Sequence, residues 1–133
     1  MEQRITLITL GVSDLKKSRD FYEKKFGWTP LPTSSDDIVF FQLNAIQLAL
    51  FPDQALAEDA QVEAHGSGFK KFTLAHNVRS EKEVDELVAQ LEERGVVIVK
   101  RPQKVFWGGY SGYVADLDQN LWEIAYNPYL LPD

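Results

Sequence analysis

Residues 105–128, VFWGGYSGYVADLDQNLWEIAYNP, decide the fold of this chain. They predict a loop, a strand, a tight polar turn and a second strand. Asp118-Gln119-Asn120 supplies the turn, because Asp and Asn tolerate positive φ and hydrogen-bond their own backbone. Glu123 then stands in the second strand between two large apolar residues. A carboxylate at such a position must have a partner, hold a ligand or face a cavity.

Length and composition narrow the class of protein. A chain of 133 residues with 44% hydrophobic and 26% charged residues suits one globular domain. The absence of cysteine excludes disulfides and thiolate metal sites. A net charge of -6 disfavours nucleic acid and anionic membranes as partners. Without a signal-like start or an apolar run that could span a bilayer, we expect a cytoplasmic protein.

The expected elements occur twice in the same order. The first half predicts a strand at 5–12, a helix at 14–26 and strands at 28–31, 38–43 and 45–51. The strand at 28–31 is expected to be a short edge strand between prolines. The second half predicts a strand at 69–78, a helix behind the capping box Ser80–Glu83, a strand at 96–99, and the two strands of the opening stretch. Each half therefore reads strand, helix, strand, strand, strand, which indicates an internal repeat.

An acidic segment separates the two halves. It contains four carboxylates and no Lys or Arg between Pro52 and Gly68, with one helical turn expected at 54–57. We predict a single domain, residues 1–133. Module one occupies about 1–52, the acidic linker 53–67 and module two 68–133.

Strand alternation predicts which residues share a face. Residues two apart in a strand lie on the same side of the sheet. In the first, fourth, fifth and eighth expected strands, one side is bulky and suits packing under a helix. The other side is small or polar and holds, in chain order, Leu7, Thr9, Gln47, Thr73 and Glu123. Because small side chains cannot fill a gap between sheets at core density, we infer a cavity rather than a solvent-facing surface here.

Three aromatic residues stand beside the glycines of the opening stretch. Trp107, Tyr110 and Tyr113 could contact a ligand by stacking or cation–π interactions. Packing at the strand edge explains them equally well, so both interpretations stay open.

The chain resembles the vicinal oxygen chelate superfamily, which includes glyoxalase I, extradiol dioxygenases, fosfomycin-modifying enzymes and bleomycin resistance proteins. The resemblance rests on Val12-Ser13-Asp14-Leu15, Ser18, Phe21-Tyr22, Gly27, the 107–113 segment, Asp116-Leu117-Asp118 and Leu121-Trp122-Glu123. It covers the whole chain. It implies an α+β fold with two βαβββ modules forming a cupped mixed sheet around a central cavity, usually in a homodimer.

The resemblance also implies where a divalent metal would bind. The ligand positions of the family fall on Leu7, Gln47, Thr73 and Glu123. Only Gln47 and Glu123 are suitable, because leucine cannot ligate and threonine is a poor neutral ligand. We therefore predict no metal and no other cofactor. His76 is expected on the helix-facing side of its strand, where packing explains it better than ligation.

These observations favour a metal-free protein that binds a small molecule. Its ligand would lie in the cavity, anchored by Glu123 and Gln47 and flanked by Leu7, Thr9, Thr73 and the three aromatic residues. The alternative is a lyase, isomerase or dioxygenase-like enzyme in which Glu123 is the general base or a partial metal ligand. We expect a homodimer with no nucleic-acid or membrane partner.

Overall fold

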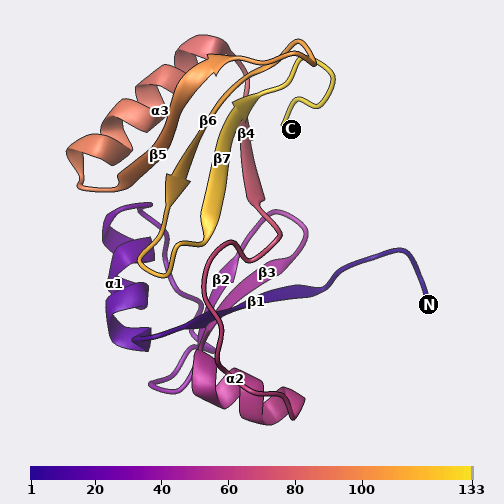
Figure 1. The fold of residues 1–133 in the computed structure, drawn as a ribbon, viewed down its shortest axis with the longest axis vertical. Helices are drawn as coiled ribbons and strands as arrows, with labels where there is room; N and C mark the ends of the chain where they lie inside the picture. The colour runs from indigo at the N-terminus through magenta and orange to yellow at the C-terminus, as the bar shows by residue number, and fades with distance from the viewer. Residues whose placement is uncertain (133) are drawn as a thin grey trace. The chain divides into compact units, whose positions relative to one another are not determined.

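A computed structural model describes residues 1–132, and it divides into two compact units, Met1–Ser67 and the residues from Gly68 onward (Figure 1). Each unit combines a mixed sheet with helices, so the expected α+β class is confirmed. No helix in the described part of the chain has the length and apolar character needed to cross a membrane.

The first unit holds a three-stranded sheet. Its elements are β1 (Leu7–Val12), α1 (Leu15–Lys24), β2 (Val39–Gln42), β3 (Gln47–Pro52) and α2 (Asp53–Ala60). The strand order is β1-β3-β2, with β3 parallel to β1 and antiparallel to β2. The parallel pairing requires a crossover, which α1 and β2 provide.

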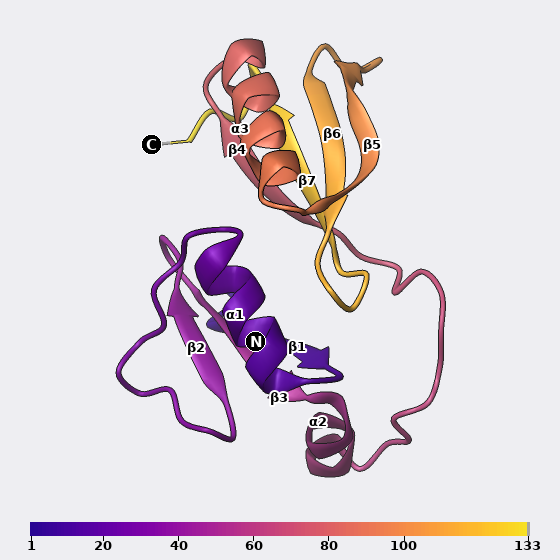
Figure 2. The ribbon, with the colours of Figure 1, turned by 90° about the vertical axis from the view of Figure 1, so that its left-hand side faces the viewer.

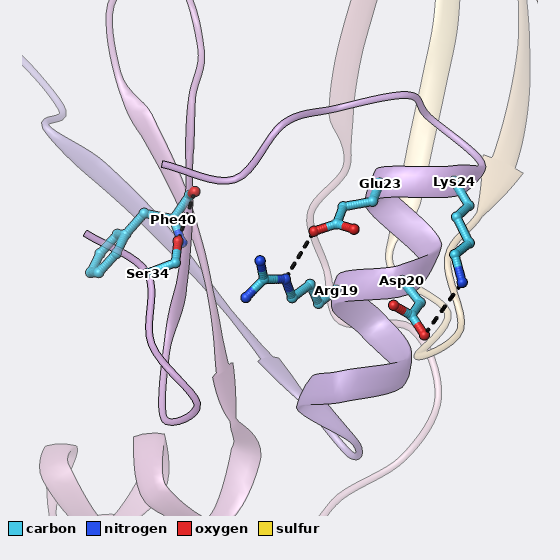
Figure 3. A network of polar contacts seen from close by, with 6 residues as sticks. All are labelled: Arg19, Asp20, Glu23, Lys24, Ser34 and Phe40. Carbon is cyan, nitrogen blue, oxygen red and sulfur yellow. Dashed lines mark hydrogen bonds and ion pairs between the residues drawn. The ribbon is translucent and has the colours of Figure 1, made fainter. Parts of the chain in front are cut away.

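Helix α1 covers the bulky face of this sheet. Asp14 caps it by accepting a hydrogen bond from the backbone N–H of Lys17 at 3.0 Å. Its buried face carries Phe21 and Tyr22, whose rings join those of Phe26, Trp28 and Phe41 in one aromatic cluster. The outer face carries i,i+4 ion pairs, Arg19–Glu23 and Lys24–Asp20 (Figure 3).

The predicted edge strand at 28–31 does not form. Pro30 and Pro32 have no backbone N–H, so this stretch cannot build a ladder. A single bond from the N–H of Leu31 to the carbonyl of Phe40, 2.7 Å, holds it beside β2. The hydroxyl of Ser34 adds two contacts, accepting from the N–H of Phe40 at 2.9 Å and donating to its carbonyl at 3.3 Å (Figure 3).

The acidic segment begins as a helix rather than a linker. The sequence predicted one turn at 54–57, whereas α2 spans Asp53–Ala60 and ends at Gln61 in the left-handed conformation. It packs against the first sheet: a Cβ placed on Gly11 would lie 3.3 Å from the Cβ of Asp53 and 3.4 Å from a methyl group of Leu56. Only the residues after α2 form the extended connection to the second unit that Figure 2 shows.

The second unit holds a four-stranded sheet. Its elements are β4 (Leu74–Val78), α3 (Glu81–Glu93), β5 (Val97–Lys104), β6 (Tyr110–Ala115) and β7 (Leu121–Tyr126). The order is β4-β7-β6-β5, with β4 parallel to β7 and the other pairs antiparallel. Strand β5 extends five residues beyond the predicted end at 99, and its pairing with β6 is interrupted by two register shifts.

Helix α3 packs on one face of the second sheet (Figure 1). As predicted, Ser80 caps it, accepting from the N–H of Glu83 at 3.1 Å. Val84, Val88 and Leu91 form its buried stripe. Polar pairs tie its exposed side to β5, namely Glu81–Lys104 and Glu92–Arg101.

Candidate functional site

The register of the second sheet places Glu123 between Ala75 on β4 and Tyr113 on β6. Its neighbours in sequence, Trp122 and Ile124, are only 4% and 3% exposed and lie on the side covered by α3. Glu123 points to the opposite side and is partly buried. The strand alternation had predicted this division, because the side-chain period of two forbids all three residues from sharing a face.

Tyr113 and Glu123 are cross-strand neighbours on that side of the sheet, and the side chains of Glu123 and Thr73 both influence the pKa of Tyr113. Thr73 is exposed, and Tyr113 is partly buried. We call the surface formed by Thr73, Ala75, Tyr113 and Glu123 the Glu123 face.

The surroundings of Tyr113 keep its phenol protonated. Desolvation by burial raises its pKa, and the charge of Glu123 and the hydrogen bond to its carboxylate raise it further. The bond from Thr73 opposes this effect by stabilising the phenolate. At neutral pH the phenol is therefore a hydrogen-bond donor.

A polar turn fixes the hairpin that brings Tyr113 opposite Glu123. The buried carboxylate of Asp116 accepts bonds from the N–H groups of Asp118 and Asn120, at 2.9 and 2.8 Å, and from the Asn120 side-chain amide at 2.8 Å. Lys70 donates to the Asn120 oxygen at 2.9 Å. The residue with positive φ is Gln119, at 60°, rather than the predicted Asp or Asn.

The three aromatic residues of the glycine-rich stretch do not share one surface. Tyr110 is in register with Tyr126 and its hydroxyl donates to Asp85 of α3 at 2.6 Å, so it lies on the helix side, away from Tyr113. This hydrogen bond is the main reason that the pKa of Tyr110 rises to about 12. Trp107 lies over Gly109 in the β5–β6 loop, since a Cβ on Gly109 would collide with its ring. Of the three, only Tyr113 belongs to the Glu123 face.

The first unit presents a simpler polar group on the corresponding side of its sheet. The side-chain amide of Gln47 donates to the Gln42 oxygen at 3.2 Å. Leu7 is the register neighbour of Gln47 on β1, and Thr9 is the neighbour of Ala49. Leu7 is 40% exposed, so an apolar side chain flanks the amide pair.

The donor set does not fit the metal that the family resemblance implies. Among residues 1–132, no group of three or more His, Cys, Asp or Glu side chains is placed to hold an ion. Leu7 and Thr73 occupy two of the four implied positions, and neither side chain is a suitable ligand for a divalent ion. His76 is in register with Ile124 on the α3 side, and His65 contacts Glu63 in the connecting segment.

Two contacts near the Glu123 face could not be predicted from the sequence. The C-terminal segment crosses one end of the Glu123 side of the sheet, because the side-chain amide of Asn77 donates to the Leu130 carbonyl at 3.0 Å. Lys100 on β5 is in register with Tyr113. No local pattern marks the first contact, which joins residues 53 positions apart. The pairing of Lys100 with Tyr113 was missed because the sequence predicted that this strand ends at 99, whereas β5 continues to Lys104.

Comparison with solved structures places this geometry among known folds. A glyoxalase-related enzyme from Fulvimarina pelagi is 41% identical, with a TM-score of 0.84 over 96% of this chain and 90% of that chain. Lactoylglutathione lyase from Agrobacterium tumefaciens shares the fold at 22% identity and a TM-score of 0.74, over 95% of each chain. The fosfomycin resistance protein FosX from Listeria monocytogenes does so at 24% and 0.72, over 96% of this chain and 95% of that chain.

The family assignment rests on the sequence match as well as on the fold. The model of the Glyoxalase/Bleomycin resistance protein/Dioxygenase superfamily matches residues 4–124, nearly the whole chain. The match includes both β1 and the hairpin that carries Tyr113 and Glu123. The chain belongs to the Glyoxalase/Bleomycin resistance protein/Dioxygenase superfamily.

Proposed function

We propose that this protein binds a small organic molecule on the Glu123 face without a resident divalent metal. The observation that carries the proposal is the cross-strand pair of Tyr113 and Glu123 on the side of the sheet opposite α3. Within residues 1–132 no ion pair includes Glu123, and a partly buried carboxylate without a cationic partner favours a bound ligand over a purely structural role. Ala75, which stands beside Glu123, leaves space next to the carboxylate.

The chemistry of the implied metal positions supports a metal-free site. A catalytic divalent ion usually takes three protein ligands and favours His or carboxylate oxygens. Here Leu7 has no donor atom, and Gln47 is engaged with Gln42. Across the strands Glu123 faces Tyr113 rather than a second strong metal-ligating side chain.

The relatives support a small-molecule ligand without naming it. The superfamily is named for glyoxalase and bleomycin resistance proteins, and its structural neighbours include a lactoylglutathione lyase and a fosfomycin resistance protein. Each of these names refers to a small organic compound. We extend to this chain only the class of ligand.

The proposal is tested by metal addition and ligand recovery. Adding nickel, zinc or manganese should leave the melting temperature unchanged, because a protein without a site gains nothing from binding. Mass spectrometry of compounds released from protein purified from cells should reveal an organic ligand. Elemental analysis of protein prepared without chelator that gives about one metal ion per chain would contradict the proposal.

An enzymatic function is the second candidate, and the cross-strand pairing of Tyr113 with Glu123 favours it. A carboxylate next to a phenol is a reasonable general base, since the phenol can orient it toward a substrate proton. If the recovered compound is converted when it is returned to the protein, and Glu123→Gln abolishes conversion while keeping binding, the enzyme is the better description. Unchanged compound after prolonged incubation supports a binding protein.

We also propose that the chain forms a homodimer. Strand β5 lies at one end of its sheet, and its Val97 and Val99 are exposed, at 64% and 53%. Exposed apolar edge strands favour association with another chain. Sedimentation at micromolar concentration should give twice the chain mass, and a monomer would count against this proposal.

A further inference from the structure

The C-terminal segment turns back toward the second sheet after β7 ends at Tyr126. The carbonyl oxygen of Asn127 accepts a hydrogen bond from the N–H of Leu130 at 3.1 Å, and its side-chain oxygen accepts one from the N–H of Tyr129 at 2.9 Å. Asn followed by Pro is typical of such a turn, because asparagine bonds its own backbone and proline fixes φ at the next position. Figure 1 shows the segment returning beside β4. We call residues 127–132 the strap.

The strap contacts two separate parts of the second unit. The side-chain amide of Asn77 on β4 donates to the carbonyl of Leu130 at 3.0 Å. The ring of Tyr129 lies beside the β5–β6 loop, since a Cβ on Gly108 would be 3.7 Å from it. In the sheet order, β7 and β6 lie between β4 and that loop. The strap therefore spans the end of the sheet at which β7 finishes and β6 begins.

Two rows of side chains cross the sheet on the side opposite α3. The first, which we call the Asn77 row, consists of Asn77, Ala125 and Ser111, and the next consists of Ala75, Glu123 and Tyr113. Ala125 and Ser111 are each only 2% exposed, whereas Glu123 and Tyr113 are partly buried. A methyl group and a hydroxymethyl group are too small to shield each other, so their burial needs cover from another segment. The hydrogen bond from Asn77 places the strap at this row.

The strap itself is only lightly held. The side chains of Tyr129, Leu130 and Leu131 are 82%, 66% and 54% exposed, so they do not belong to the core. The hydrogen bond from Asn77 to the strap is also exposed. Segments with few buried apolar contacts and exposed hydrogen bonds open at a lower free energy than the core does. The strap can therefore lift while the sheet and α3 stay folded.

We propose that the strap is an opening cover over the Asn77 row, and that Asn77 is the positioning residue which holds it closed. The closed strap limits a ligand to the row of Glu123. The open strap adds the methyl group of Ala125 and the hydroxyl group of Ser111 to the binding surface. The enlarged surface suits a longer ligand that carries an apolar part and a second hydrogen-bonding group. The inference rests on the proposed function, because it concerns the size of the ligand that the same side of the sheet accepts.

Single cysteines can measure this opening, because the chain contains no cysteine of its own. Ala125→Cys places a thiol under the strap, and Ile124→Cys is the matched control, similarly buried at 3% but on the α3 side. The probe is monobromobimane, a planar thiol reagent of the size of a small organic ligand. In the otherwise unmodified chain, Ala125→Cys should react at least about tenfold faster than Ile124→Cys, because lifting the strap requires less free energy than opening the core.

Removing the anchor tests the role of Asn77. Asn77→Ala should speed the reaction of Ala125→Cys by about two- to tenfold, the change expected when one hydrogen bond is lost, and leave Ile124→Cys unchanged. Asn44→Ala, at an exposed position between β2 and β3 of the first unit, should change neither rate. Ending the chain after Asn127 should speed the reaction of Ala125→Cys further, because the cover is then gone.

The outcomes separate this inference from the proposed function. Equal rates for Ala125→Cys and Ile124→Cys in the otherwise unmodified chain would overturn the inference, because the strap would then open only with the core. An Ala125→Cys rate that is unchanged both by Asn77→Ala and by shortening the chain would overturn it as well. Either result leaves the Glu123 face as a binding surface, whereas the metal and ligand analyses test the proposed function without reference to these rates. If neither strap variant folds, the comparison of the two thiols still decides.

Discussion

The two units begin with the same order, strand, helix, strand, strand, and then differ, because the first ends in α2 and the second adds a fourth strand. The first packs aromatic rings of α1 and its following loop against three strands, and its polar face carries only the Gln42–Gln47 amide pair. The second packs an aliphatic stripe of α3 against four strands and carries the cross-strand pair of Tyr113 and Glu123 on its other face. The same scaffold thus supports a neutral pair in one unit and a charged group in the other.

This difference indicates that the chemistry is concentrated in the second unit. The Gln42–Gln47 pair is neutral, and Gln42 also donates to two backbone carbonyls, so this face offers a ligand no charge. The carboxylate of Glu123 offers both a charge and lone pairs. Each of the following experiments tests this difference between the two units.

The largest effect is expected within two adjacent residues of β7. Trp122→Ala should lower the free energy of unfolding by about 3–5 kcal/mol, the usual loss when a large aromatic residue leaves a core. Glu123→Gln should change this free energy by no more than about 0.5 kcal/mol, because Glu123 is only partly buried and glutamine has nearly the same size and shape. Chemical denaturation followed by circular dichroism measures both, and the reverse order would show that the faces are misassigned.

A smaller effect is expected from the glycines inside the two sheets. On Gly112 of β6 a Cβ would stand 2.6 Å from the Lys100 carbonyl and 2.8 Å from the Pro102 nitrogen, both backbone atoms of β5. Gly112→Ala should therefore cost about 1–3 kcal/mol. A Cβ on Gly11 in the first unit would lie no closer than 3.3 Å to its neighbours, so Gly11→Ala should destabilise the protein less. If denaturation shows that both variants lose the same stability, the backbone of β5 can move aside to accommodate the new methyl group.

The smallest effect concerns how the second unit holds its helix to its sheet. The bond to Asp85 raises the pKa of Tyr110 to about 12, above the value near 10 of an unfolded tyrosine. The folded state therefore keeps the proton longer, and this contribution to stability is complete below about pH 10 and disappears by about pH 12. Ultraviolet titration of the phenols should show a late step that Tyr110→Phe removes. Tyr129→Phe, on an exposed ring, should retain it.

Most of the architecture was predictable because it follows from periodicity. Alternation placed Trp122 and Ile124 opposite Glu123, and the capping residue Ser80 marked the start of α3. The same rule, applied to β6, separates Tyr110 from Tyr113, since they are three apart. Grouping Tyr110 and Tyr113 by their glycine neighbours ignored that rule, so the two tyrosines were considered together although they lie on opposite faces of the sheet.

Long-range contacts could not be predicted in the same way. Nothing near Asn77 in sequence shows that its side-chain amide donates to the carbonyl of Leu130 near the end of the chain. The stretch at 28–31 was expected to be a short edge strand between prolines, but the prolines prevented the ladder. The acidic composition of 53–60 also obscured the full length of α2, in which Glu58 and Asp59 are exposed while Ala57 is buried.

The placement of the tryptophans gives the protein three built-in optical reporters. Trp28 stacks among the rings of the first unit, Trp107 covers Gly109 in a loop, and Trp122 lies in the core of the second unit. These are all the tryptophans of the chain. Variants that keep one indole at a time would let fluorescence follow the first unit, the β5–β6 loop and the second unit separately. Such spectra would reveal whether the two halves of this repeat melt as one body or in turn.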